Sequence, residues 1–236
     1  MLDAPLHNRP EIVALLKRQL EQTLAKSSGD VRLSLGPPTI DRTLDGGLAL
    51  PGLHEVIGNG GSAIATMLAS QAGGAIAWIL GRDRVRRPYP CGFKIAGIQT
   101  KNILLVTPHR RDILWALEQA LKSGVLRAVI AEVSSAPDFT ESRRLQLAAV
   151  AGGALGLLLP PDSAHHASAA QTRWRATAIP RSSASGSPRY RLELLRNKKG
   201  SLTCWEVDWH GPSHRFHLAS TSHDRSHSTP RARMAG

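Results

Sequence analysis

The sequence predicts an α/β fold, with a mostly parallel sheet flanked by helices and a late group of antiparallel strands. Over residues 52–159, short apolar runs alternate with helical segments, which is the pattern of right-handed βαβ units. Three strand-like runs then follow one another without helices, at residues 173–179, 189–196 and 202–209. Of the 236 residues, 42% are hydrophobic, enough to fill the core of such a fold.

Each predicted element depends on a local pattern. Residues 10–26 carry apolar side chains at helical spacing, with Pro10 near the start of the helix. Residues 39–50 predict a short helical turn closed by Gly46 and Gly47. Buried strands are predicted at residues 52–57, 75–80, 102–107, 128–133 and 154–159. Helices are predicted between them, at residues 62–74, 108–123 and 139–151.

Positive charge gathers in two windows of the sequence. Thirty Lys and Arg against eighteen Asp and Glu give a net charge of +12. Residues 82–111 and 171–200 each carry eight basic residues and one acid, so together they hold +14 and the rest of the chain sums to −2. In the second window Trp174 and Tyr190 lie among the basic residues, a combination that can bind nucleic acid. A β-ribbon with its arginines facing solvent is the alternative interpretation. The candidate nucleic-acid or partner contacts are Arg173, Arg175, Arg189, Arg191, Arg196, Lys198 and Lys199.

A glycine-rich turn between a predicted strand and a predicted helix is the context of a phosphate-binding loop. The candidate loop residues are Gly58, Gly60, Gly61 and Ser62. In the motif G-x-x-x-x-G-K-[ST], the lysine contacts phosphate and the hydroxyl binds Mg²⁺. Alignment from Gly58 puts Ile64 at the lysine position and Ala65 at the hydroxyl position. We therefore expect weak anion binding at most, with no ATPase activity and no cofactor.

Other catalytic and metal-binding arrangements are also disfavoured. Cys91 and Cys204 form neither a disulfide framework nor a cysteine-rich zinc site. The histidines of residues 210–227 have helical spacing in places, but glycine, proline and polar composition oppose a helix there. Glu132, at the end of a predicted strand, occupies the place of a Walker B acid. We predict no catalytic residue and no metal site. Since no apolar run can span a bilayer, we expect a cytoplasmic protein without membrane contact.

The order of elements resembles a RecA core with an eroded nucleotide motif. Over about Ser34 to Trp209, three segments in the same order also resemble the ImuA family: TLDGGLALPGLHEVIG, NILLVTPHRRDILWALEQALKSGVLRAVIAEV and RYRLELLRNKKG. We accordingly divide the chain into an N-terminal helical segment (1–33), a RecA-like domain with a degenerate phosphate loop (34–209) and a disordered basic tail (210–236).

The resemblance implies a non-catalytic adaptor of a translesion synthesis complex, or mutasome, that is induced in the SOS response to DNA damage. The implied partners are an ImuB-like inactive Y-family polymerase homologue, RecA, an error-prone DNA polymerase III α-type subunit, and DNA. Two alternatives stay open. One is an ATP-dependent DNA-repair ATPase in which Arg82 or Arg84 supplies the missing cation. The other is an inhibitor of cell division similar to SulA, which belongs to the same broader group.

Overall fold

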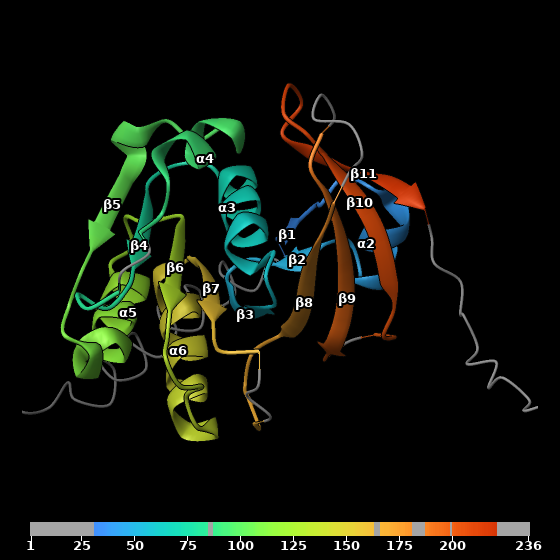
Figure 1. The fold of residues 1–236 in the computed structure, drawn as a ribbon. Helices are drawn as coiled ribbons and strands as arrows, with labels where there is room; N and C mark the ends of the chain where they lie inside the picture. Colours follow the sequence, from blue (N-terminus) through green and yellow to red (C-terminus); the bar gives the residue numbers. More distant parts are fainter. Residues whose placement is uncertain (1–30, 85–86, 163–165, 181–186, 199, 221–236) are drawn as a thin grey trace, which may run out of the picture.

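The structure, a computed structural model, describes residues 31–84, 87–162, 166–180, 187–198 and 200–220. Its centre is a nine-stranded sheet with the order β11-β10-β9-β8-β3-β7-β6-β4-β5 (Figure 1). The strands are β3 (Gly52–Ile57), β4 (Ile76–Ile79), β5 (Ile103–Val106), β6 (Ala128–Glu132), β7 (Leu155–Leu159), β8 (Thr172–Ile179), β9 (Arg189–Asn197), β10 (Cys204–His210) and β11 (Arg215–Ser220). All neighbours from β8 to β5 pair in parallel, and those from β8 to β11 pair antiparallel. The predicted fold class is therefore confirmed.

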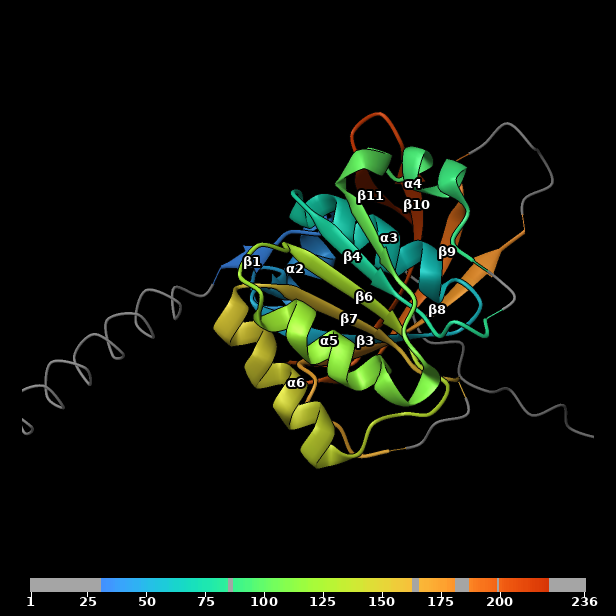
Figure 2. The ribbon, with the colours of Figure 1, turned by 90° about the vertical axis from the view of Figure 1, so that its left-hand side faces the viewer.

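Helices cover both faces of the parallel half (Figures 1 and 2). On one face lie α3 (Gly61–Ala72) and the short α4 (Pro90–Ile95), while α5 (Ile113–Lys122) and α6 (Phe139–Gly152) lie on the other. Each face buries its own apolar cluster, because side chains alternate between the faces along every strand. A small sheet of β1 (Arg32–Leu33) and β2 (Leu48–Ala49), with α2 (Pro38–Thr43) between them, packs beside the antiparallel half.

Local signals set the ends of α6. The side chain of Asp138 accepts a hydrogen bond from the backbone N–H of Glu141 at 2.7 Å, and the Glu141 side chain accepts one from Asp138 at 2.9 Å. This capping box satisfies N–H groups that have no partner within the helix. Gly153, with φ of 69°, ends the helix in the left-handed conformation.

The structure differs from the sequence prediction in several elements. The chain from residue 210, predicted as a disordered tail, includes the edge strand β11, where Phe216 packs edge-on against Trp209 with ring centroids 5.0 Å apart. α4 and β1 were not predicted, and the predicted turn at residues 39–50 is α2 followed by β2. The predicted helix at residues 10–26 lies outside the described residues, as does the chain after residue 220.

Candidate functional site

The glycine turn at the end of β3 is too short to surround a phosphate. β3 ends at Ile57 and α3 begins at Gly61, so only Gly58, Asn59 and Gly60 connect them. A phosphate-binding loop has four residues between its two glycines, and this length lets backbone N–H groups converge on an anion. The sequence correctly places a strand, a turn and a helix here. The turn itself, however, is closed, which here means that it is too short to surround a phosphate.

The turn is also bound to its neighbour β8. The N–H of Gly60 donates to the carbonyl of Ala176 at 2.9 Å, and Asn59 Oδ1 accepts from the N–H of Ala178 at 2.9 Å. Gly58 has φ of +91°, and a Cβ there would lie 2.4 Å from the Ala176 oxygen. These glycines therefore permit close packing between a turn and a strand, which is a structural use of the pattern.

The remaining positions of the phosphate motif are occupied by the core. Ile64, where the lysine would lie, is 2% exposed within the cluster under α3. Ala65, where the hydroxyl would lie, is fully buried. The next residue, Thr66, donates its hydroxyl to the carbonyl of Ser62 at 2.6 Å within the helix. The predicted loop residue Ser62 itself lines a pocket at the start of α3.

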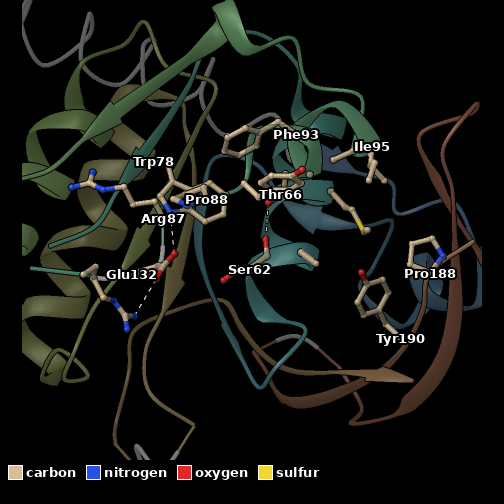
Figure 3. Close-up of a pocket in the computed structure, with 16 residues that line it drawn as sticks. Ser62, Thr66, Trp78, Arg87, Pro88, Phe93, Ile95, Glu132, Pro188 and Tyr190 are labelled. Carbon is tan, nitrogen blue, oxygen red and sulfur yellow. Dashed lines mark hydrogen bonds and ion pairs between the residues drawn. The ribbon is translucent and has the colours of Figure 1, made fainter. Parts of the chain in front are cut away.

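That pocket, of about 490 Å³, lies at the carboxyl ends of the parallel strands between α3, α4 and β9 (Figure 3). Glu132 and Trp78 lie on one side of it and Tyr190 and Pro188 on the other. Its walls are mainly apolar, and Trp78 meets Phe93 edge-on with ring centroids 5.6 Å apart. Such walls suit an apolar group better than a triphosphate.

Glu132, the candidate Walker B acid, is engaged at both carboxylate oxygens. The indole N–H of Trp78 donates to Oε1 at 3.2 Å, and the Arg84 guanidinium lies 3.1 Å from Oε2. A metal ion at this carboxylate would have to displace a cation, which opposes binding of Mg²⁺. Arg84, which the ATPase alternative assigns to phosphate, is instead paired with an acid.

The candidate basic contacts divide into three groups by their surroundings. The first is Arg173, whose Nε lies 2.6 Å from Oε2 of the fully buried Glu55. The other carboxylate oxygen of Glu55 accepts from Ser168 Oγ at 2.5 Å and meets His166 Nε2 at 3.3 Å. With His54 and Thr172, these residues form the polar contact between β3 and β8, hereafter the seam.

Within the seam, hydrogen bonds define the protonation of His54. Its Nε2 lies 2.9 Å from the carbonyl of Ala49, which only accepts, so Nε2 carries the proton. Thr172 accepts from the indole of Trp174 at 2.8 Å and therefore donates to His54 Nδ1 at 2.8 Å. Burial lowers the pKa of His54 to about 4, and the ring is neutral.

The second group lines the outer faces of β8 to β10 and pairs across the strands. Arg189 binds Asp208 at 2.8 Å, and Arg191 meets Glu206 at 3.0 Å. Arg175 contacts Asp162 at 3.2 Å. The two pairs between β9 and β10 are hereafter the ladder. The Glu206 hydrogen bond raises the pKa of Arg191. This arrangement matches the β-ribbon interpretation in its geometry, but acids neutralise its arginines: Asp208 and Glu206 of β10 pair with the arginines of β9, and Asp162 pairs with Arg175.

The third group fastens the segment that precedes β8. Arg196 donates to the carbonyl of Ser168, and Lys198 Nζ donates to the carbonyl of Ala169 at 2.7 Å. Burial, followed by the charges of Arg196 and Arg143, lowers the pKa of Lys198. Lys199 lies outside the described residues. The structure therefore does not unite the other six candidates, all of which it describes, into one open basic surface.

Sequence reasoning missed the residues of the seam, apart from Arg173. A signal was present, because His54 and Glu55 interrupt an otherwise apolar strand predicted to be central. Charged groups at such a position require a buried partner. That partner, Arg173, is 118 residues away, and spacing alone does not identify it.

The parallel order around β3 and the strand–turn–helix unit define the class: a RecA-like α/β domain with a closed phosphate loop. A crystal structure of the RadB recombinase has the same fold, with a TM-score of 0.56 and 15% identity over 76% of this chain and 96% of that chain. No protein-family model matches the chain. Among the described residues, no helix has the length and apolar character to cross a membrane.

The sequence comparison identifies the family. The chain is 33% identical to Protein ImuA of Caulobacter vibrioides, strain NA1000 / CB15N, over 221 residues, which cover 80% of this chain and 88% of that protein. Protein ImuA of strain ATCC 19089 matches to the same extent. The chain therefore belongs to the ImuA family, and the resemblance seen in the sequence is confirmed.

Proposed function

We propose that this chain is a non-catalytic adaptor of a DNA-damage-inducible mutagenesis complex. Its partners are an ImuB-like inactive polymerase homologue, an error-prone DNA polymerase and RecA, as membership of the ImuA family implies. The observation that carries the non-catalytic part is the closed turn at Gly58, which is bound to β8 and followed by a buried isoleucine instead of a lysine.

Physical chemistry supports this over the ATPase alternative. Phosphoryl transfer depends on positioned cations and Mg²⁺ around the γ-phosphate. Here the carboxylate of Glu132 and the guanidinium of Arg84, one of the two arginines that line the pocket, are paired with each other. A nucleotide that entered this pocket would lose its hydrogen bonds with water and would meet mainly apolar walls instead.

Nucleotide binding and turnover test the non-catalytic part. We expect purified full-length chain to release no phosphate from ATP above the buffer rate, with or without Mg²⁺ and single-stranded DNA. Arg84→Ala is the matched variant, and we expect it to give the same result. Turnover in the wild type that is lost in Arg84→Ala would establish the ATPase alternative instead.

Partner recovery tests the adaptor part. Tagged chain would be purified from DNA-damaged cells and its partners identified by mass spectrometry, with a second chain ending at Ser220 for comparison. Truncation at Trp209 is unsuitable because it removes β11. We expect the ImuB-like protein and the error-prone polymerase with both chains. Recovery of cell-division proteins in their place would favour the SulA-like alternative.

A further inference from the structure

The two outer edges of the nine-stranded sheet differ in their protection. At β11, the N–H of Phe216 donates to the carbonyl of Leu35 at 3.4 Å, and Gln71 donates to the carbonyl of His214 at 3.2 Å. At the opposite end, β5 pairs with β4, and no described strand pairs with its outer side. Figure 1 shows β5 as the outermost strand of the parallel half.

Apart from its short length of four residues, β5 lacks the usual devices that keep an edge strand from pairing with another chain. Its sequence, ILLV, contains no charge and no proline, and its register with β4 has no bulge. Leu104 is 55% exposed on the face of α5, and Leu105 is 45% exposed on the face of α3. Proteins normally place lysine, proline or a bulge on such an edge to prevent pairing with other chains. An unprotected apolar edge is therefore a candidate interaction surface.

The hydrogen bonds between β4 and the chain from β5 onward show which backbone groups of β5 point away from the sheet. The carbonyl of Val106 accepts from Leu80 at 3.1 Å, and that of Pro108 accepts from Arg82 at 2.9 Å. Backbone groups alternate in direction along a strand, so Val106 and Leu104 face β4. Ile103 and Leu105 consequently direct their N–H and C=O groups away from the sheet.

The charges that flank β5 select the kind of partner. Lys101 precedes the strand, and Arg110 and Arg111 follow it. The nearest acid in the sequence, Asp112, lies 3.8 Å from Arg111, so the flanks keep a net positive charge. If two copies paired antiparallel through β5, Lys101 of one copy would lie at the same end of the strand pair as Arg110 and Arg111 of the other. Like charges gathered at both ends oppose such pairing. Acidic residues on both sides of an apolar strand complement this edge.

We propose that the β5 edge binds an extended segment of another protein, apolar at its centre and acidic at both flanks, which joins the sheet as a further strand. Backbone bonds to Ile103 and Leu105 would provide affinity, and Leu104 and Leu105 would contact its side chains on the two faces. The inference does not depend on the proposed function, because three strands separate β5 from the turn at Gly58.

Two synthetic peptides test the proposal, EEVTVTVEE and its basic counterpart KKVTVTVKK. Each carries a fluorescent label at its N-terminus and an amide at its C-terminus, and each is titrated with the full chain by fluorescence anisotropy. We expect the acidic peptide to bind at least tenfold more tightly than the basic one. Amide hydrogen exchange gives the backbone evidence. The acidic peptide should slow exchange at Ile103 and Leu105, whereas the amides of Leu104 and Val106 are slow from the start.

Two variants of one residue locate the contact. Leu105→Pro removes an outward N–H and leaves the bonds to β4, so affinity for the acidic peptide should fall at least tenfold. Leu105→Glu keeps the backbone N–H and adds a negative charge, so it should lower the affinity of the acidic peptide and raise that of the basic one. Leu147→Glu, at an exposed leucine of α6, is the matched control and should change neither.

Three outcomes would overturn the proposal. The first is an acidic peptide that does not bind at millimolar concentration or binds no better than the basic one. The second is binding that survives both Leu105 variants. The third is a dimer of the chain in sedimentation equilibrium that Leu105→Pro dissociates, since a second copy would then cover this edge.

Discussion

The seam and the ladder hold similar arginine–carboxylate pairs in different surroundings. In the seam, the Glu55 side chain is fully buried and that of Arg173 is 14% exposed. In the ladder, the Arg191 side chain is 48% exposed and that of Glu206 is 20% exposed. Removing one partner of a buried pair leaves an uncompensated charge, whereas water solvates the survivor of an exposed pair. The same sequence signal, an arginine in a strand, can therefore correspond to very different contributions to the free energy of unfolding.

Loss of the buried carboxylate should have the largest effect. Glu55→Ala leaves Arg173 without its charge partner and Ser168 without an acceptor, so we expect the free energy of unfolding to fall by about 3–5 kcal/mol. Urea unfolding followed by circular dichroism measures it. Glu55→Gln, which keeps an acceptor for Ser168, should lose less. A loss below about 1 kcal/mol for Glu55→Ala would show that the seam behaves like the ladder.

Acid should weaken the seam through His54. The unfolded chain binds a proton at this ring near pH 6.5, and the folded chain does so only near pH 4. Between these values protons favour the unfolded chain, so the free energy of unfolding falls as pH falls, by about 3 kcal/mol in total. Urea unfolding at intervals from pH 7 to pH 4 tests this. His54→Asn should flatten the curve, and an unchanged curve would assign the acid sensitivity to other groups.

Closure of the turn against β8 should be sensitive to one added methyl group. In Gly58→Ala the new Cβ meets the Ala176 carbonyl at positive φ, so we expect a loss of about 2 kcal/mol or more. Gly124 is the matched control, because it has φ of +72° and no atom within 4 Å of an added Cβ. Thermal unfolding of Gly58→Ala and Gly124→Ala separates the cost of the contact with Ala176 from the cost of placing alanine at a positive φ. Equal losses of stability in the two variants would mean that the turn moves away from β8 to accommodate the new Cβ.

The ladder should show the smallest effect. Because water solvates both groups, Arg191→Ala should cost less than about 1 kcal/mol. A double-mutant cycle with Glu206→Ala measures the coupling between the two residues, and 0.5 M salt should reduce it. A coupling above about 2 kcal/mol would remove the distinction between the two regions.

The sequence was sufficient for most of the parallel half. The runs that become β4 and β7 are continuous and apolar, and those that become β3 and β6 are apolar except for His54, Glu55 and Glu132. Segments of helical periodicity separate them, so local pattern and tertiary structure agree. β11 was missed because histidine, serine and arginine dominate its surroundings, although Phe216 and Leu218 alternate as in a strand. α4 was missed because its six residues include proline and glycine, and packing of Phe93 against Trp78 accompanies its helical form.

The candidate site was predicted less well, for a physical reason. The missing lysine at Ile64 was evident from spacing, but the binding of Asn59 and Gly60 to β8 is a contact between distant segments. The acids opposite Arg189 and Arg191 are likewise on another strand. Whether a basic residue is free or paired depends on register, which residue counts do not give.

The position of β3 has a consequence during synthesis. β3 begins at Gly52, but it lies between β7 and β8, the second of which ends at Ile179. Until that strand leaves the ribosome, the apolar surface of β3 and the carboxylate of Glu55 lack their native partners. The centre of the sheet is therefore completed only after β8 has been synthesised. A product cut short before β8 would present an incomplete sheet to the quality-control machinery of the cell.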